Sequence, residues 1–285
     1  MNTFGRQMDT KKIRYRKAIV TLIDILGFTQ LIKNSSPAEI VYRKLEEVRK
    51  STKSLGEGWG DSLRDFLPQV FQFSDTIIRV RFTDTNKREF PIKLLCTEIG
   101  DIAFAQMELI NQGVLMRGGM GYGDVCITDQ NVVFGPAYID AHNMESKYAI
   151  YPRIIISSDL MSGYFQNKII HKNDDNLRDK YNHISDLLRK GDDGIFYVDY
   201  ATAIESKLRD KEDYLKFLRK HRILIIEGCN NNTGNRGFLN KYLWLATYHN
   251  SIVSKKTDNW FKGYNLSRRD LLITKDDSSY LHDLG

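Results

Sequence analysis

The sequence predicts an α+β fold, and three observations support this prediction. The β-branched and almost wholly apolar run Lys17–Ile25 is typical of a buried strand. Two further apolar runs, Gln69–Phe73 and Thr76–Phe82, are joined tightly around Ser74 and Asp75 and predict an antiparallel hairpin. Segments with helical spacing lie on both sides of this hairpin, which separates the pattern from the strict strand–helix alternation of a doubly wound parallel sheet.

A glycine and two helical segments follow the first strand. Gly27 ends the strand, and Phe28–Ile32 is predicted to form a first helical turn. The run Ser36–Glu39 has the order of an N-cap, a proline at the first helical position and a capping-box glutamate. We therefore expect a helix over about residues 37–54.

The middle of the chain continues with one helix and further strands. The polar, glycine-rich segment Gly56–Asp65 leads to the hairpin. Apolar spacing then predicts a helix over Ile92–Gln112, which Gly113 ends. A strand over Val114–Met120, a glycine-rich turn and a short strand over Val125–Thr128 are expected next.

A helix around Ala137–Tyr148 and a strand over Arg153–Ser157 complete this part of the chain. The order of strands and helices suits a ferredoxin-like α+β sandwich. We expect residues 17–158 to form it, with residues 1–16 as a basic N-terminal segment.

Residues 159–285 are expected to form an α-rich extension that packs on this sheet or extends it. The chain becomes more polar after Ser158. The expected elements are an exposed helix over Asp174–Lys190, a strand over Gly194–Val198, and helices around Tyr200–Lys220 and Phe238–Val253.

The composition limits the class of protein. The chain has 285 residues, of which 41% are hydrophobic, as in ordinary globular proteins. The apolar run Ala18–Leu26 is too short to span a bilayer, so we expect no membrane span and a cytoplasmic location. Cys96, Cys126 and Cys229 form no C-x-x-C motif, which favours buried or inert thiols.

The net charge of +6 suits a polyanionic partner but does not identify one. A nucleic-acid-binding surface would need clustered cations interleaved with exposed aromatic residues. No such stripe is evident, so no nucleic-acid partner is expected.

Asp24 is an acid in an otherwise apolar strand, where an unpaired charge would cost several kcal/mol. A buried salt bridge or a helix-capping role would compensate it. The functional alternative is a metal ligand, favoured by the following run Gly27–Thr29, whose backbone N–H groups begin a helix.

Asp75 repeats this pattern in the hairpin turn, where an ordinary turn aspartate is the structural alternative. Together, Asp24 and Asp75 at adjacent strand ends would supply the anionic oxygen ligands that Mg²⁺ or Mn²⁺ needs beside a triphosphate. The pair therefore predicts a metal-dependent nucleotide site.

These residues resemble the motifs of a known enzyme family. The run Asp24–Thr29 is similar to the D-I-x-G-F-T motif of class III nucleotidyl cyclases, and Phe73–Thr76 falls where that family has its second metal aspartate. The stretches Phe134–Ser146 and Pro152–Ile154 are similar to a third motif, so the resemblance covers about residues 17–158. It implies the class III cyclase catalytic fold, with two divalent ions, Mn²⁺ or Mg²⁺, held by Asp24, the Ile25 carbonyl and Asp75.

The departures from this family concern the base and the transition state. The asparagine and arginine that orient the ribose and stabilise the transition state would fall at Ile139 and Asn143. The adenine-reading lysine position holds Phe71, and its acidic partner position holds Val132. A purine-reading pocket is therefore not favoured.

The chain is most similar in these features to the pyrimidine cyclases of bacterial Pycsar antiphage systems. That resemblance implies conversion of UTP, or else CTP, to the 3′,5′-cyclic monophosphate and pyrophosphate. The cyclic monophosphate would then activate a separate effector protein. It further implies a homodimer with active sites at the interface. A purine cyclase and a catalytically degenerate nucleotide-binding domain remain the alternatives.

The same resemblance suggests roles for further side chains. Arg117 would contact the pyrimidine carbonyl or a phosphate, Phe28 and Thr29 would bind substrate, and Phe71 would line the base pocket by stacking. Arg117 as a surface salt-bridge residue and Phe71 as a core residue are the structural alternatives. Weaker candidates for base or triphosphate contacts are Tyr15, Tyr122, Tyr138 and Lys147.

Overall fold

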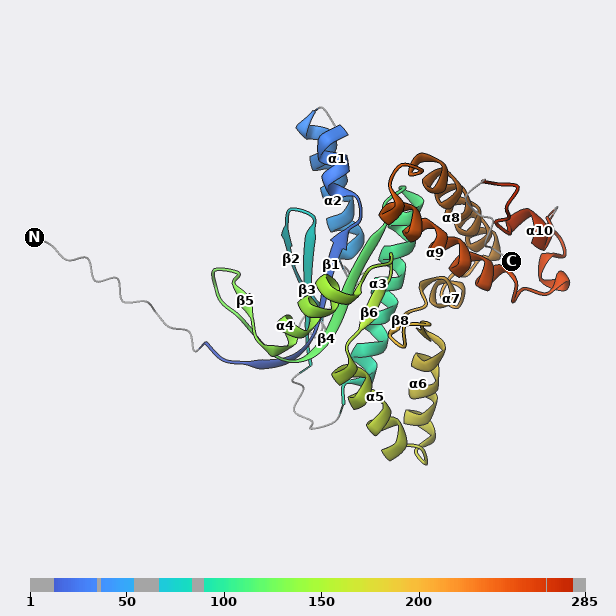
Figure 1. The fold of residues 1–285 in the computed structure, drawn as a ribbon. Coiled ribbons are helices and arrows are strands. Elements are labelled where there is room, and N and C mark those ends of the chain that lie inside the picture. Colours follow the sequence, from blue (N-terminus) through green and yellow to red (C-terminus); the bar gives the residue numbers. More distant parts are fainter. Residues whose placement is uncertain (1–12, 35–36, 54–66, 84–89, 265, 279–285) are drawn as a thin grey trace, which may run out of the picture.

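The computed structural model describes residues 13–34, 37–53, 67–83, 90–264 and 266–278 (Figure 1). Three sequence predictions lie outside the described residues. They are most of the basic N-terminal segment, the Ser36 N-cap and the polar segment Gly56–Asp65.

The predicted α+β architecture is present, built on one mixed sheet. Its first part contains four strands in the order β2-β3-β1-β4, and all neighbouring strands in it are antiparallel. These strands are β1 (Arg16–Ile25), β2 (Gln69–Phe73), β3 (Thr76–Phe82) and β4 (Met116–Ile127). This order, with helices connecting β1 to β2 and β3 to β4, is ferredoxin-like.

Three short strands from residues 154–198 extend the sheet past β4. β6 (Ile154–Ile156) pairs with β4 in parallel, β8 (Phe196–Val198) pairs with β6, and β7 (Leu188–Lys190) lies at the edge. The two-residue β5 (Val133–Phe134) folds back onto the end of β4.

One face of the sheet packs on long helices. They are α1 (Phe28–Asn34), α2 (Ala38–Thr52) and α3 (Ile92–Asn111). Ile19 and Ile23 of β1 and Ile77 of β3 point to this face and join the main hydrophobic core. Val20 and Leu22, which alternate with them along β1, point to the opposite face, because successive residues of a strand alternate.

The opposite face carries α4 (Pro136–Asn143), which continues as the π-helix η2 (Met144–Tyr148). Leu22, Ile78 and Ala141 belong to a smaller core beneath α4. The glycines of β4 permit this approach: a Cβ on Gly119 would lie 2.4 Å from the Ala141 carbonyl oxygen and 2.7 Å from the Glu145 nitrogen.

The prediction of a glycine-rich turn between Met120 and Val125 is wrong. The structure has one strand, β4, through this whole segment. The glycines here provide space for a packed helix rather than a reversal of the chain.

The C-terminal part is mainly helical, and two predicted boundaries in it are corrected. The segment Asp174–Lys190 is not one helix, because α6 ends at Asp186 and β7 follows. The segment Tyr200–Lys220 is two helices, separated where the Asp210 side chain caps the second. An additional helix at Ser158–Ile170 was not expected. The helices of this part are α5 (Ser158–Ile170), α6 (Asp175–Asp186), α7 (Tyr200–Glu205), α8 (Lys211–Asn231), α9 (Arg236–Val253), the 3₁₀ helix η3 (Asp258–Phe261) and α10 (Arg268–Leu271).

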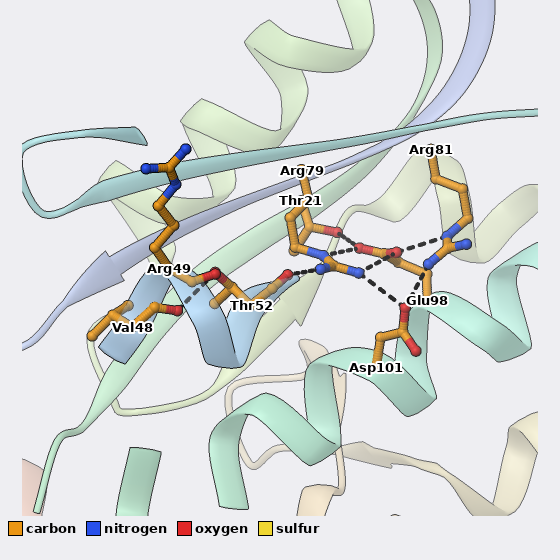
Figure 2. A network of polar contacts seen from close by, with 8 residues as sticks. All are labelled: Thr21, Val48, Arg49, Thr52, Arg79, Arg81, Glu98 and Asp101. Atoms are coloured by element: carbon orange, nitrogen blue, oxygen red, sulfur yellow. Dashed lines mark hydrogen bonds and ion pairs between the residues drawn. The ribbon is translucent and has the colours of Figure 1, made fainter. Parts of the chain in front are cut away.

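A buried ionic network joins the main sheet to α3 (Figure 2). Glu98 of α3 accepts hydrogen bonds from Arg79 (2.9 Å, Nε–Oε1), Arg81 (2.8 Å, Nε–Oε2) and Thr21 (3.0 Å, Oγ1–Oε1). Asp101 pairs with both arginines, and Arg79 also donates to the carbonyl of Thr52 at the end of α2. The network connects β1, β3, α2 and α3 and so holds the strands that carry the candidate site.

No helix within the described residues is long and apolar enough to cross a membrane. The cysteines are free: Cys126 and Cys229 are buried and Cys96 is partly buried.

Candidate active site

Two carboxylates meet at one end of the sheet. Asp24 is the penultimate residue of β1, and it lies opposite Thr76 of β3. Asp75 directly precedes Thr76 in the β2–β3 turn, where Ser74 adopts a left-handed backbone with φ of 57°. The strand register therefore brings the two predicted metal ligands together.

Arg117 completes a three-residue ionic cluster with Asp24 and Glu145. It lies opposite Asp24 in the β1–β4 pairing, and its Nε is 2.9 Å from Asp24 Oδ2. Its Nη2 is 2.9 Å from Glu145 Oε1 of η2, and its Nη1 donates to the Ala149 carbonyl at 3.1 Å. The salt bridge considered from the sequence as an alternative for Asp24 is therefore present, and it is partly buried.

Burial makes both carboxylates easier to protonate than usual. Burial raises the pKa of Asp24, and the neighbouring charge of Asp75 raises it further, whereas Arg117 opposes this rise. Burial likewise raises the pKa of Glu145, with Asp24 and Asp75 adding to the effect against Arg117. The site thus carries more negative charge than one guanidinium compensates, which is the electrostatic condition for binding additional cations.

The donor set at this site fits a divalent metal only in part. Among the described residues there is no cluster of three or more His, Cys, Asp or Glu side chains placed to hold a metal ion. Mg²⁺ in phosphate-transferring sites, however, is commonly bound through one or two carboxylates together with substrate phosphates and water. Asp24 and Asp75 supply that minimum, and Ile25, whose carbonyl was the third predicted ligand, directly follows Asp24 in the chain.

An open groove of about 780 Å³ runs from this cluster along the α4 face of the sheet. Thr76 and Glu145 lie at its ionic end, and Phe73, Tyr138 and His142 supply aromatic walls. A groove with a charged end and aromatic walls has the general form of a small-molecule binding site.

The other predicted substrate residues are placed in three different environments. The Phe28 side chain is 9% exposed and belongs to the main core, on the face opposite the groove. Thr29 is exposed, and Ile25 is buried in the main core. Phe71 is half-buried, packs against the smaller core and shares the Asp24 face. Any contact of Phe28 with substrate would therefore involve its backbone.

Of the weaker candidates, only Tyr138 lines the groove. Tyr15 is exposed and its ring centroid lies 5.9 Å from that of Phe134. Tyr122 packs toward the main core near Phe90, and Lys147 is exposed on η2.

Arg153, which lies in the Pro152–Ile154 stretch of the family resemblance, is 1% exposed. It pairs with Asp193, and its guanidinium carbon lies 4.9 Å from the centre of the Tyr197 ring. These contacts join β6 to the C-terminal part and keep Arg153 out of the ionic cluster.

Sequence reasoning did not assign roles to Glu145 or Lys241. Glu145 lies in the Met-Glu-Ser run that carried the family resemblance, so its signal was available. The charges of Arg117 and Asp24 both shift the pKa of Lys241 in α9, although Lys241 is remote from both residues in sequence. Only the folded chain reveals that proximity.

Comparisons with known proteins show distant structural similarity. No family model and no curated protein matches the chain. The chain is similar to the solved structure of a class III adenylyl cyclase-like ATP-binding protein from Pseudomonas aeruginosa, with 13% sequence identity and a TM-score of 0.43. The match covers 71% of this chain and 44% of that one.

Proposed function

We propose that this protein is a nucleotide cyclase that converts a pyrimidine nucleoside triphosphate to the 3′,5′-cyclic monophosphate and pyrophosphate. The observation that supports the proposal most is the convergence of Asp24 and Asp75 at one sheet end, beside Arg117 and an open groove. Acids from separate elements meeting in this way supply the ligands for divalent ions at a triphosphate.

In this proposal Asp24 and Asp75, with the Ile25 carbonyl, hold two Mn²⁺ or Mg²⁺ ions. Bound there, the ions lower the pKa of the ribose 3′-hydroxyl and neutralise the leaving pyrophosphate. The 3′-oxygen forms a bond to the α-phosphorus, the bond from that phosphorus to the bridging oxygen breaks, and the hydroxyl proton passes to solvent. The chain's own task is positioning and charge stabilisation.

Arg117 changes partners in this scheme. Its guanidinium compensates Asp24 and Glu145 in the structure described here. With divalent ions held at Asp24, Arg117 would be free to bind a phosphate oxygen, which a planar guanidinium can contact with two donors.

The groove supports a pyrimidine base, with UTP favoured over CTP by the family resemblance. Phe71 and Phe73 lie on the Asp24 face, so aromatic side chains occupy the region where a base would stack. Exposed apolar side chains at Val132 and Ile139 beside the groove support a second copy of the chain as its cover. The resemblance adds a separate effector protein that the cyclic product activates in antiphage defence.

One observation favours a second candidate function, nucleotide binding without turnover. Asp24 already has a cationic partner in Arg117, and the positions of the family's ribose-orienting asparagine and transition-state arginine hold Ile139 and Asn143. Ile139 is 58% exposed and lies outside the groove lining.

The test is to incubate the protein with each of the four ribonucleoside triphosphates and Mn²⁺ and to identify products by mass spectrometry. We expect a cyclic pyrimidine monophosphate that Asp75→Asn abolishes and that Asp179→Asn, at an exposed position on α6, leaves unchanged. A cyclic purine product would overturn the base assignment. Triphosphate binding without any product would favour the second candidate.

A further inference from the structure

A second cavity, of about 330 Å³, lies beside the loop that follows Asp24. Its walls come from the Ile25–Phe28 loop, from α2, from the segment that precedes β4, and from α8 and α9 of the C-terminal part. Its lining contains two lysines, Lys44 of α2 and Lys241 of α9, and no acidic residue.

The first turn of α9 is held against this loop. Gly27 has φ of +81°, a conformation that glycine adopts readily, and a Cβ built on it would lie 3.6 Å from Cε1 of Phe238. The Lys241 Nζ lies 4.6 Å from the centre of the same Phe238 ring. A cation–π contact therefore holds the Lys241 ammonium beside the Gly27 backbone.

Within the described residues, neither Lys44 nor Lys241 has an anionic group at ion-pair distance, although each is partly buried. Burial lowers the pKa of Lys241, and the charge of Arg117 lowers it further, whereas Asp24 opposes this. Two partly buried ammonium groups around an acid-free cavity favour an anionic ligand with more than one charge.

We propose that Lys241 and Lys44 bind the terminal phosphates of the nucleoside triphosphate, an inference that rests on the proposed function. Gly27, which follows Asp24 by three residues, lines the same cavity as both lysines, and Lys241 interacts electrostatically with Asp24. The terminal phosphates of a triphosphate bound at Asp24 and Asp75 would therefore be within reach of these lysines if they extended over the Gly27 loop. The C-terminal part then contributes a substrate-binding residue to the same chain's site. A separate inorganic polyanion binding in the cavity is the other source of the same chemistry.

The experiment measures Mn²⁺-dependent binding of 3′-deoxy-UTP, which lacks the attacking hydroxyl, and of UMP, by calorimetry on the full chain. We expect Lys241→Met to weaken 3′-deoxy-UTP binding at least about tenfold and to leave UMP binding within about twofold. Lys241→Arg should retain most of the affinity. Lys255→Met, at an exposed lysine roughly 20 Å further along the α9 direction, is the matched control.

Inorganic tripolyphosphate separates the two sources of the ligand. Competition between tripolyphosphate and 3′-deoxy-UTP supports the shared phosphate site, whereas simultaneous binding of both would overturn it in favour of a separate polyanion site. Equal 3′-deoxy-UTP affinities in wild type and Lys241→Met, with cyclic product still formed by wild type, would overturn this inference and leave the proposed function standing. If wild type neither binds triphosphate nor forms product, both fall.

Steady-state kinetics provide a second measurement for a cyclising enzyme. If a lysine contacts the terminal phosphates equally in the ground and transition states, its removal raises KM and leaves kcat nearly unchanged. We therefore expect Lys241→Met to raise KM about tenfold, and a fall confined to kcat would contradict the assignment.

Discussion

Arg117 joins two carboxylates that come from different elements of the fold. Asp24 belongs to β1 and Glu145 to the π-helix η2, and each lies 2.9 Å from a guanidinium nitrogen. The Glu145 side chain can approach because Gly119 of β4 lets the backbone of η2 lie directly against the strand. Arg117 thus pairs directly with both carboxylates at this end of the sheet.

Replacement of Arg117 by Met should destabilise the protein by about 1–3 kcal/mol in the absence of divalent ions, because two partly buried carboxylates lose a charged hydrogen-bond donor. Mn²⁺ should then recover more stability in this variant than in wild type, since a bound cation replaces the lost charge. Urea unfolding with and without MnCl₂ measures both effects. Arg178→Met, which removes an exposed pair with Asp175, is the control, and equal Mn²⁺ stabilisation of wild type and Arg117→Met would contradict the expectation.

At the scale of elements, Glu98 connects α3 to two strands of the sheet. It is fully buried between Arg79 and Arg81, which alternate with apolar residues along β3 and so share one face (Figure 2). Burial alone would raise the pKa of Glu98, but the two arginines outweigh burial and lower it to about 2. The carboxylate is therefore ionised in the folded protein at all but strongly acidic pH.

Replacement of Glu98 by Gln should cost about 3–5 kcal/mol of unfolding free energy, because two buried guanidinium groups lose their shared carboxylate. The free energy of unfolding from urea titration at pH 7 measures this. Glu46→Gln removes a more exposed pair with Arg49 and should change stability by less than about 1 kcal/mol. A loss at Glu98 no larger than that of the control would show that Asp101 alone holds the arginines.

At the scale of the whole molecule, a buried chain of hydrogen bonds ties the C-terminal helices together. His249 Nε2 lies 2.9 Å from the Leu271 carbonyl and must donate to it, which leaves Nδ1 of a neutral His249 as an acceptor. His221 Nδ1 lies 3.1 Å from that atom and therefore donates. His221 Nε2 then accepts from the Tyr200 hydroxyl at 3.0 Å, so every member is satisfied only when both histidines are neutral.

This arrangement predicts acid sensitivity. Burial lowers the pKa of His249 from 6.5 to about 4, and burial also lowers the pKa of His221 well below its usual value. Below pH 6.5 the unfolded chain takes up protons that the folded chain does not, so stability is complete above that pH and falls as the pH approaches 4. The slope is about 1.4 kcal/mol per pH unit for His249 alone.

The measurement is the free energy of unfolding from urea titrations at pH 7 and pH 5. Glu98 of the folded protein stays ionised across this interval, because its pKa is about 2. We expect wild type to lose about 2 kcal/mol or more between these values. His249→Gln should show a smaller loss, and His183→Gln, at an exposed position, should behave as wild type. Equal stability of wild type at both pH values would show that the histidines are already charged in the fold.

Much of the fold follows from local sequence signals. The hairpin Gln69–Phe82 and the two acids at the ends of strands were predicted at their observed positions, because strand alternation and a tight turn are properties of neighbouring residues. The helices α3 and α9 were also predicted close to their observed bounds. The turn predicted at the glycines of β4 was wrong, because the sequence does not distinguish a glycine that makes room for a packed helix from a glycine in a turn.

The sequence by itself determined the α+β class, the hairpin and the two acids as candidates for one site. Only the tertiary structure decided which charges meet: Glu145 with Arg117, Glu98 with Arg79 and Arg81, and Lys241 with the loop after Asp24. Periodicity shows which face of an element a side chain occupies, but not which element covers that face. That depends on the packing of segments far apart in the chain, which local propensity does not encode.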